Sequence, residues 1–166
     1  MQHLRRFLGL TRRRQALLVE CGWALLGAAW QVRRWPFSRL ADSLGHTGAA
    51  TAAPKSPHAG ADPEAAAAAE AVGGALAAWA RVWPWTPTCL MLAVAACRLL
   101  RRRGLAGEIV FGVRGVGLAP AAPPATLGAH AWLHCAGRVV TGEAESRAFR
   151  PIAAIRFGPG PAARSP

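Results

Sequence analysis

The sequence predicts an α+β fold in which helices come first and a small antiparallel sheet follows. Apolar stretches of helical length fill much of the chain as far as Gly104, whereas short strand-like segments follow from residue 108 onward. The length of 166 residues and the hydrophobic content of 52% suit one domain with a real core and some loose ends. A second full domain is therefore not expected.

The beginning of the chain is predicted to be an N-terminal helical segment, 1–45. A long helix is expected over 11–32, and PFSRLADSLG encodes a short helix that ends at Gly45. The basic stretch MQHLRRFLGLTRRR in front of an apolar helix leaves a membrane-associated helix as an alternative. Because Glu20 and Gln31 interrupt an apolar stretch that is already short for a bilayer, membrane association is the less favoured interpretation.

A flexible linker is expected over 46–63, where HTGAATAAPKSPHAGADP is rich in Pro, Ala and Gly and has no apolar periodicity. An Ala-rich helix follows over 64–83. The next helix, 88–103, is apolar nearly all round, which predicts that it is buried. Thr88 can cap its start, and Gly104 can terminate it.

Strands are expected at EIVFGVR, AHAWLHC and RVVTGE, and a further strand at AAIRF near the end of the chain. Together with the two preceding helices, they make up the predicted core domain, 64–156. The last residues, 157–166, are expected to form a disordered tail.

Charge and cysteine usage restrict the partners and the compartment. The formal net charge is +12, but 19 of the 20 basic residues are Arg, and tyrosine, one of the aromatic residues that nucleic-acid groove readers place among their basic residues, is absent, so no nucleic-acid partner is expected. An acidic peptide or a membrane surface remains compatible with this charge. The four cysteines show neither a CxxC pair nor regular spacing, which indicates reduced thiols and a cytoplasmic location. Tightly spaced ligand pairs are also missing, so no metal or other cofactor is expected.

Cys89 is the first candidate for chemistry, because it stands where the Pro- and Trp-rich stretch WPWTPT gives way to the buried helix. In the first turn of a helix, unpaired backbone N–H groups favour a thiolate and can also receive the oxyanion formed when that thiolate attacks an amide. The alternative is that Cys89 is a small apolar core residue.

A nucleophilic cysteine needs a base, and His130 and His134 are the histidines outside the terminus and the linker. They share one face of a predicted strand, with Trp132 between them, and Cys135 points to the other face. If Ala136 and Gly137 form a two-residue hairpin turn, Cys135 pairs with Arg138, and His130 lies opposite Glu143. Glu143 is then the candidate acid that orients the imidazole, although a bulged turn would shift this pairing by one residue.

The order Cys, His, acid, with the cysteine opening a helix, resembles that of transglutaminase-like, papain-like cysteine peptidases. The phrases PWTPTCL, LLRRRG, FGVR and AHAWLHCAGRVVTGE are more specifically similar to the leader peptidase of lasso-peptide biosynthesis, the protease half of the microcin-processing type of B protein. The N-terminal stretch LLVECGWALLGAAWQVRRWPFSRLADSLG is similar to the N-terminal helices of that family, so the likeness covers most of 10–155.

The resemblance implies a peptidase that removes the leader from a ribosomally made lasso-peptide precursor before macrocyclisation. It implies three partners: the precursor peptide with its leader, a separate leader-recognition protein and a lasso macrocyclase. By position, Cys89 matches the nucleophile and His130 the base, while Glu143 stands where the family tends to have Asp, so that either Glu143 substitutes or the site is a dyad.

Three tryptophans are candidates for the wall of a substrate groove, namely Trp83, Trp85 and Trp132, and packing against the core is the alternative role for Trp83 and Trp85. Other functions also stay open at this point. The same thioester chemistry could transfer an acyl group, and the chain could instead be a catalytically weak module that presents a peptide or a small membrane-associated protein.

Overall fold

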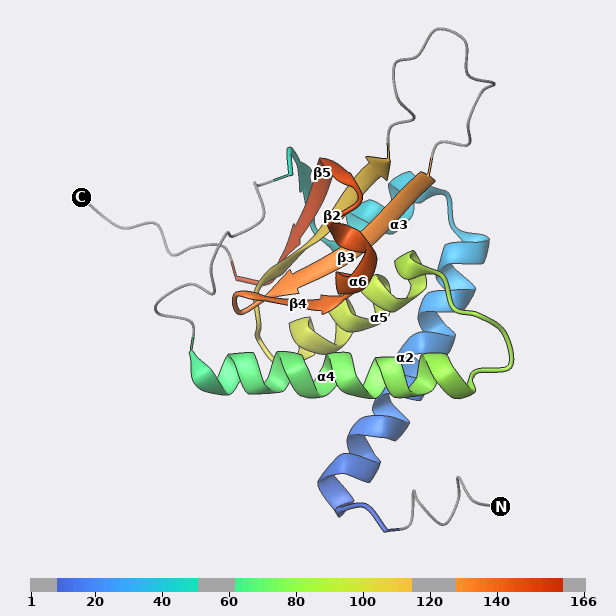
Figure 1. Cartoon of the computed structure of the whole chain (residues 1–166), viewed down its shortest axis with the longest axis vertical. Coiled ribbons are helices and arrows are strands. Elements are labelled where there is room, and N and C mark those ends of the chain that lie inside the picture. The colour runs from blue at the N-terminus through green and yellow to red at the C-terminus, as the bar shows by residue number, and fades with distance from the viewer. Residues whose placement is uncertain (1–8, 51–61, 115–127, 160–166) are drawn as a thin grey trace, which may run out of the picture.

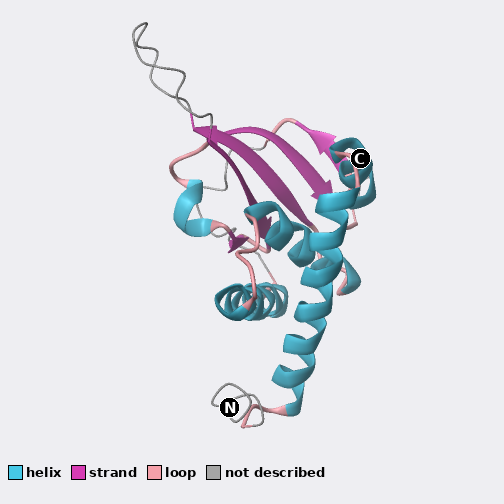
Figure 2. Cartoon of the chain, turned by 90° about the vertical axis from the view of Figure 1, so that its right-hand side faces the viewer, coloured by secondary structure: helices cyan, strands magenta, loops and turns pink. Residues whose placement is uncertain are grey.

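The structure is a computed structural model that describes residues 9–50, 62–114 and 128–159. It has the predicted α+β architecture, in which an antiparallel sheet carries the long helices on one of its faces (Figures 1 and 2). None of the helices in these ranges combines the length and the apolarity that a membrane span requires.

Two helices open the described part of the chain. Helix α2 spans Arg12–Arg34, and its basic last turn suits the negative end of the helix dipole. Helix α3 spans Phe37–Leu44 and starts directly after Pro36, whose fixed backbone angle separates the two helices. Both agree with the predicted helices within a few residues.

The next two helices are set by local capping signals. Helix α4 spans Pro63–Val82, with Pro63 in its first turn and the Asp62 carboxylate accepting a hydrogen bond from the Glu64 N–H at 2.9 Å. Helix α5 spans Cys89–Arg102 and is capped by Thr88, as predicted.

Five strands form one antiparallel sheet in the order β1-β5-β2-β3-β4. Their bounds are His46–Gly48 for β1, Gly107–Arg114 for β2, Gly128–Cys135 for β3, Arg138–Thr141 for β4 and Arg150–Phe157 for β5. A short helix, α6, spans Glu143–Ser146 between β4 and β5.

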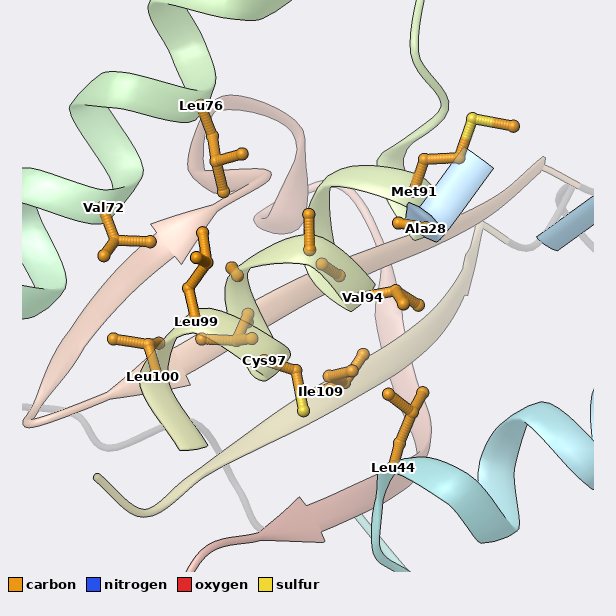
Figure 3. Packing of buried hydrophobic residues seen from close by; sticks show 14 of the residues in the cluster. Ala28, Leu44, Val72, Leu76, Met91, Val94, Cys97, Leu99, Leu100 and Ile109 are labelled. Atoms are coloured by element: carbon orange, nitrogen blue, oxygen red, sulfur yellow. The ribbon is translucent and has the colours of Figure 1, made fainter. Parts of the chain in front are cut away.

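One apolar core joins the helices to the sheet. Helix α5 lies at its centre, and most of its side chains are buried between the sheet and the helices α2 and α4 (Figure 3). Helices α2 and α3 contribute to the same core through Cys21, Leu25, Leu40 and Leu44, among others. The N-terminal helical segment therefore does not pack as a separate unit.

Two of the expected boundaries differ from the structure. Residues 46–48, assigned above to the linker, form β1, because their backbone pairs with β5 in the register His46 to Arg156. Residues 51–61 of the expected linker lie outside the described residues, as do 160–166 of the expected tail. The tail was expected to begin at Phe157, which is instead the buried last residue of β5.

Candidate functional site

Cys89 is the first residue of α5, and its side chain is half-buried. The Thr88 hydroxyl accepts a hydrogen bond from the Met91 N–H at 3.3 Å, and the Thr88 carbonyl accepts one from the Leu92 N–H at 3.1 Å. The N–H groups of Cys89 and Leu90 have no acceptor inside the helix, as expected for a first turn. The cysteine therefore lies beside backbone donors that a negative charge can use.

His130 lies on β3, and its ring packs against two aromatic side chains. The Trp132 ring stacks on it with a centroid separation of 5.9 Å, and the Phe149 ring lies 5.1 Å away on a tilted plane. Only 8% of His130 is exposed. This packing fixes the direction of the imidazole.

Two acceptors meet at one nitrogen of this ring. Nε2 of His130 lies 3.1 Å from the carbonyl oxygen of Gly142 and 3.5 Å from a carboxylate oxygen of Glu145. An acceptor at Nε2 requires a proton there, so the neutral ring carries its hydrogen on Nε2 and keeps its lone pair on Nδ1. Nδ1 is therefore the nitrogen that can act as a base.

The hairpin that leads to the acidic residues follows the predicted turn and then departs from the predicted register. Ala136 and Gly137 have φ angles of +48° and +73°, and Cys135 pairs with Arg138 as predicted. The register then shifts, so that Leu133 pairs with Thr141, where β4 ends. The predicted pairing of His130 with Glu143 is wrong for this reason.

The acids instead lie on the short helix α6. Gly142, with a φ of +76°, turns the chain from β4 into α6, and a Cβ on this residue would come within 2.8 Å of His130 Nε2. The turn brings the Glu145 carboxylate to His130, although 69% of that side chain is exposed. Glu143 lines the same cleft and forms neither a hydrogen bond nor an ion pair with the imidazole.

Cys89 and His130 both line two adjoining clefts. The first, termed the polar cleft, encloses about 600 Å³ and is also lined by Arg114, Glu143 and Glu145. The second, termed the apolar cleft, encloses about 370 Å³ and extends between α3 and the ends of β2, β3 and β5. No hydrogen bond joins the cysteine to the histidine among the contacts of the described residues.

The three tryptophans lie outside the lining of these two clefts. Trp132 is buried behind His130, where its indole N–H donates a hydrogen bond of 2.8 Å to Nε2 of His134. Trp83 and Trp85 pack edge-to-face with ring centroids 5.3 Å apart, and the Arg33 guanidinium lies over the Trp85 ring. Trp132 therefore supports the imidazole from behind.

Three residues at the site were not singled out from the sequence. Arg114 ends β2 in the polar cleft and lies over the Phe149 ring at 5.5 Å. Phe149 is the second of these residues, and Gly142 is the third. The Gly142 carbonyl reaches Nε2 of His130 because of the left-handed turn after β4. The TG dipeptide after the RVV strand is the one local signal of that turn.

The other cysteines differ from Cys89 in their surroundings. Burial raises the pKa of Cys21 to about 11, that of Cys97 to about 12 and that of Cys135 to about 11. These three thiols are fully covered members of the core, whereas Cys89 opens into both clefts.

Comparison with known proteins bears on the family. A search of the curated proteins and a search of the solved structures found no match to this chain. A scan against protein-family models found a match to the transglutaminase-like superfamily over residues 31–154, which takes in α3, α4, α5 with Cys89, and the sheet with His130 as far as Ala154 of β5. The chain belongs to the transglutaminase-like superfamily.

Proposed function

We propose that this chain is a cysteine peptidase that removes the leader from a ribosomally made lasso-peptide precursor before macrocyclisation. The observation that carries the proposal is the placement of Cys89 at the start of α5, in the same clefts as a histidine whose Nε2 faces two acceptors. A transglutaminase-like domain is compatible with a cysteine peptidase. The choice of a lasso-peptide leader as substrate comes from the sequence resemblance described above.

The reaction begins when Nδ1 of His130 accepts the proton of the Cys89 thiol. Sγ then attacks the carbonyl carbon of the leader–core amide, and the N–H groups of Cys89 and Leu90 are suited to stabilise the oxyanion. Substrate binding has to bring Sγ and Nδ1 within hydrogen-bond reach, since such contacts are often longer without substrate.

The intermediate then resolves in two steps. The imidazolium of His130 gives its proton to the amine as the C–N bond breaks, which releases the core with a free amino terminus and leaves the leader as a thioester on Cys89. Water, deprotonated by the same imidazole, attacks the thioester carbon, and the C–S bond breaks to give the leader carboxylate and the free thiol.

A carboxylate that holds the Nε2 proton would keep the imidazole in the reactive tautomer. The 3.5 Å approach of its carboxylate to Nε2 favours Glu145 for this role, whereas Glu143 is the residue that the sequence pointed to. Either carboxylate is consistent with the lining of the polar cleft.

The partners follow from the same proposal. They are the precursor peptide, a separate leader-recognition protein and a lasso macrocyclase that uses the freed amino terminus. The site of action is then the cytoplasm, where the precursor is made.

The test is cleavage of a lasso precursor in the presence of its leader-recognition protein, followed by mass spectrometry. The expected products are a leader with a free carboxylate and a core with a free amino terminus. Cys89→Ala should abolish cleavage, and His130→Ala should leave at most a trace, because the thiol then loses both its activation and the proton donor for the amine. Full cleavage by Cys89→Ala contradicts the proposal.

A peptide-presenting module is the second candidate. It is favoured by the absence of a hydrogen bond between Cys89 and His130 and by the exposure of the Glu145 carboxylate. This candidate predicts precursor binding that is the same for wild type and Cys89→Ala, with no cleavage by either. A leader recovered as an amide or ester of an added amine or alcohol would instead indicate acyl transfer.

A further inference from the structure

The apolar cleft has a lining that suits a side chain rather than a charged group. Its floor comes from the ends of β2, β3 and β5, and Phe37 of α3 meets Phe111 of β2 edge-to-face at 5.5 Å along one wall. Apart from Thr47, Cys89 and His130, the residues that line it are apolar or glycine. Apolar side chains bind in such enclosures because binding removes their surface from contact with water.

This cleft is continuous with the reaction centre of the proposed peptidase. Cys89 and His130 line both clefts, so a carbonyl carbon bonded to Cys89 Sγ lies at the junction between them. A peptide that crosses this junction has one half of its chain in each cleft.

The charges of the clefts distinguish the two halves. The polar cleft holds the Glu143 and Glu145 carboxylates against one guanidinium, that of Arg114, and so carries a net negative charge. The amine that leaves becomes a cationic amino terminus, which is favoured beside carboxylates. In the lining of the apolar cleft, besides the nucleophile Cys89 itself, His130 is the one side chain that can become charged, and it does so only when its imidazole is protonated. The amine half therefore fits the polar cleft, and the acyl half fits the apolar cleft.

We propose that the apolar cleft is the subsite for a large aliphatic or aromatic side chain in the acyl half of the substrate, on the residue that carries the scissile carbonyl. This inference rests on the proposed peptidase function and adds the substrate class of that site. Its volume of about 370 Å³ accommodates one such side chain.

The experiment uses acyl-side affinity probes that do not depend on a lasso precursor: N-acetyl-alanine, -leucine, -phenylalanine and -aspartate chloromethyl ketones. In each, the Cys89 thiolate attacks the methylene carbon, a C–S bond forms and chloride leaves. The rate of Cys89 labelling is followed by peptide mapping, with iodoacetamide as a probe that has no side chain. The leucine and phenylalanine probes should label Cys89 on the order of ten- to a hundredfold faster than the alanine probe, and the aspartate probe should be slower than alanine.

Two alanines allow the same substitution to be made in each cleft. Ala129 lines the apolar cleft and Ala144 lines the polar cleft, and both are exposed, so that phenylalanine is tolerated at either position. Ala129→Phe should fill the apolar cleft and bring the leucine-to-alanine rate ratio close to one, whereas Ala144→Phe should keep the ratio of the wild type. Phe37→Ala, which removes an exposed wall residue, should lower the ratio without unfolding the chain.

Three results would overturn the inference. Equal labelling by the leucine, alanine and aspartate probes, with Cys89 still the residue labelled, rejects the subsite and leaves the nucleophile in place. A ratio that collapses in Ala144→Phe and persists in Ala129→Phe places the acyl half in the other cleft. Failure of every probe, iodoacetamide included, to label Cys89 rejects both the subsite and the proposed peptidase.

Discussion

At the scale of single residues, the imidazole of His130 determines what the site can do. Its Nε2 faces the Gly142 carbonyl and the Glu145 carboxylate, while Trp132 and Phe149 pack against the ring. The carbonyl alone is enough to keep the proton on Nε2, because a backbone oxygen accepts and cannot donate. The Glu145 carboxylate would in addition attract the protonated ring, and solvent screens part of this attraction.

The two glutamates of α6 provide a matched test of that contribution. Glu145→Gln should lower kcat for leader cleavage by less than about tenfold, since its carboxylate is mostly exposed and the Gly142 carbonyl stays in place. Glu143→Gln should have a smaller effect than Glu145→Gln, because Glu143 forms neither a hydrogen bond nor an ion pair with the imidazole. Steady-state kinetics on the precursor measure both variants, and a larger loss in Glu143→Gln would restore it as the orienting acid.

The four thiols should differ in their reaction with iodoacetamide. Burial raises the pKa of Cys21, Cys97 and Cys135 to about 11 or above, so these side chains stay protonated and covered near neutral pH. Cys89 is half-buried and opens into the clefts, and it should be labelled first. Peptide mapping at increasing times decides the order, and urea-unfolded protein, in which all four should react at similar rates, is the control.

His134 should make the stability depend on pH below neutrality. Burial lowers the pKa of His134 from 6.5, and the Glu108 carboxylate offsets a smaller part of this shift. The Trp132 N–H donates to Nε2 of His134, which can accept only while that nitrogen carries no proton. A lowered pKa means that the unfolded chain binds the proton more readily, so the stabilisation is present above pH 6.5 and is lost as the pH falls toward the native pKa. Between pH 7.5 and pH 5.5, the free energy of unfolding measured in urea should fall more for wild type than for His134→Gln. Equal losses would mean that His134 does not contribute.

At the scale of elements, α4 approaches the edge strand β4 through a glycine. A Cβ on Gly73 would lie 2.6 Å from the carbonyl oxygen of Val140, the residue next to the register shift in the hairpin. Backbone oxygens cannot move aside as the end of a flexible side chain can. The close contact of α4 with β4 therefore depends on the absence of a side chain at position 73.

Neighbouring glycines in α4 predict opposite effects of one substitution. Gly74→Ala meets no atom within 4 Å and should raise the free energy of unfolding by up to about 1 kcal/mol, because alanine is the better helix former. Gly73→Ala carries the same gain in propensity but forces α4 away from β4, so it should be net destabilising. Denaturant titration of the two variants measures the difference, and stabilisation by Gly73→Ala would show that the contact is loose.

Sequence reasoning succeeded where an element is set by its own residues. Thr88 caps α5 and the Ala136–Gly137 turn forms as the sequence predicts, because both signals are local. It failed for β1, whose three residues form a strand only by pairing with β5, more than a hundred positions away. The register shift between β3 and β4, which places Glu145 at His130, lies outside the two turn residues from which the pairing was predicted.

At the scale of the whole molecule, α2 has two distinct faces. Its buried face, which includes Cys21, Leu25 and Ala28, belongs to the core, so deletion of 1–45 is expected to unfold the protein rather than to isolate a binding function. Its outer face carries a stripe of exposed apolar side chains at helical spacing, namely Val19, Trp23, Leu26 and Trp30. In Figure 1 the first turns of α2 extend beyond α4.

This stripe is the expected docking face for the leader-recognition protein in the proposed pathway. Trp23 is 70% exposed, so Trp23→Ser should leave the thermal unfolding midpoint unchanged and weaken binding on the order of tenfold, as expected when a central aromatic residue is lost from an interface. Val82→Ser is the control, because Val82 is an exposed apolar residue on α4, outside the stripe. Isothermal titration with the recognition protein gives the affinities. Docking on the apolar stripe should not depend on the salt concentration. Binding of an acidic leader to Arg33 and Arg34, the exposed basic residues at the end of the same helix, should weaken as the salt concentration is raised. Equal affinities for wild type and Trp23→Ser would leave α2 with its part in the core alone.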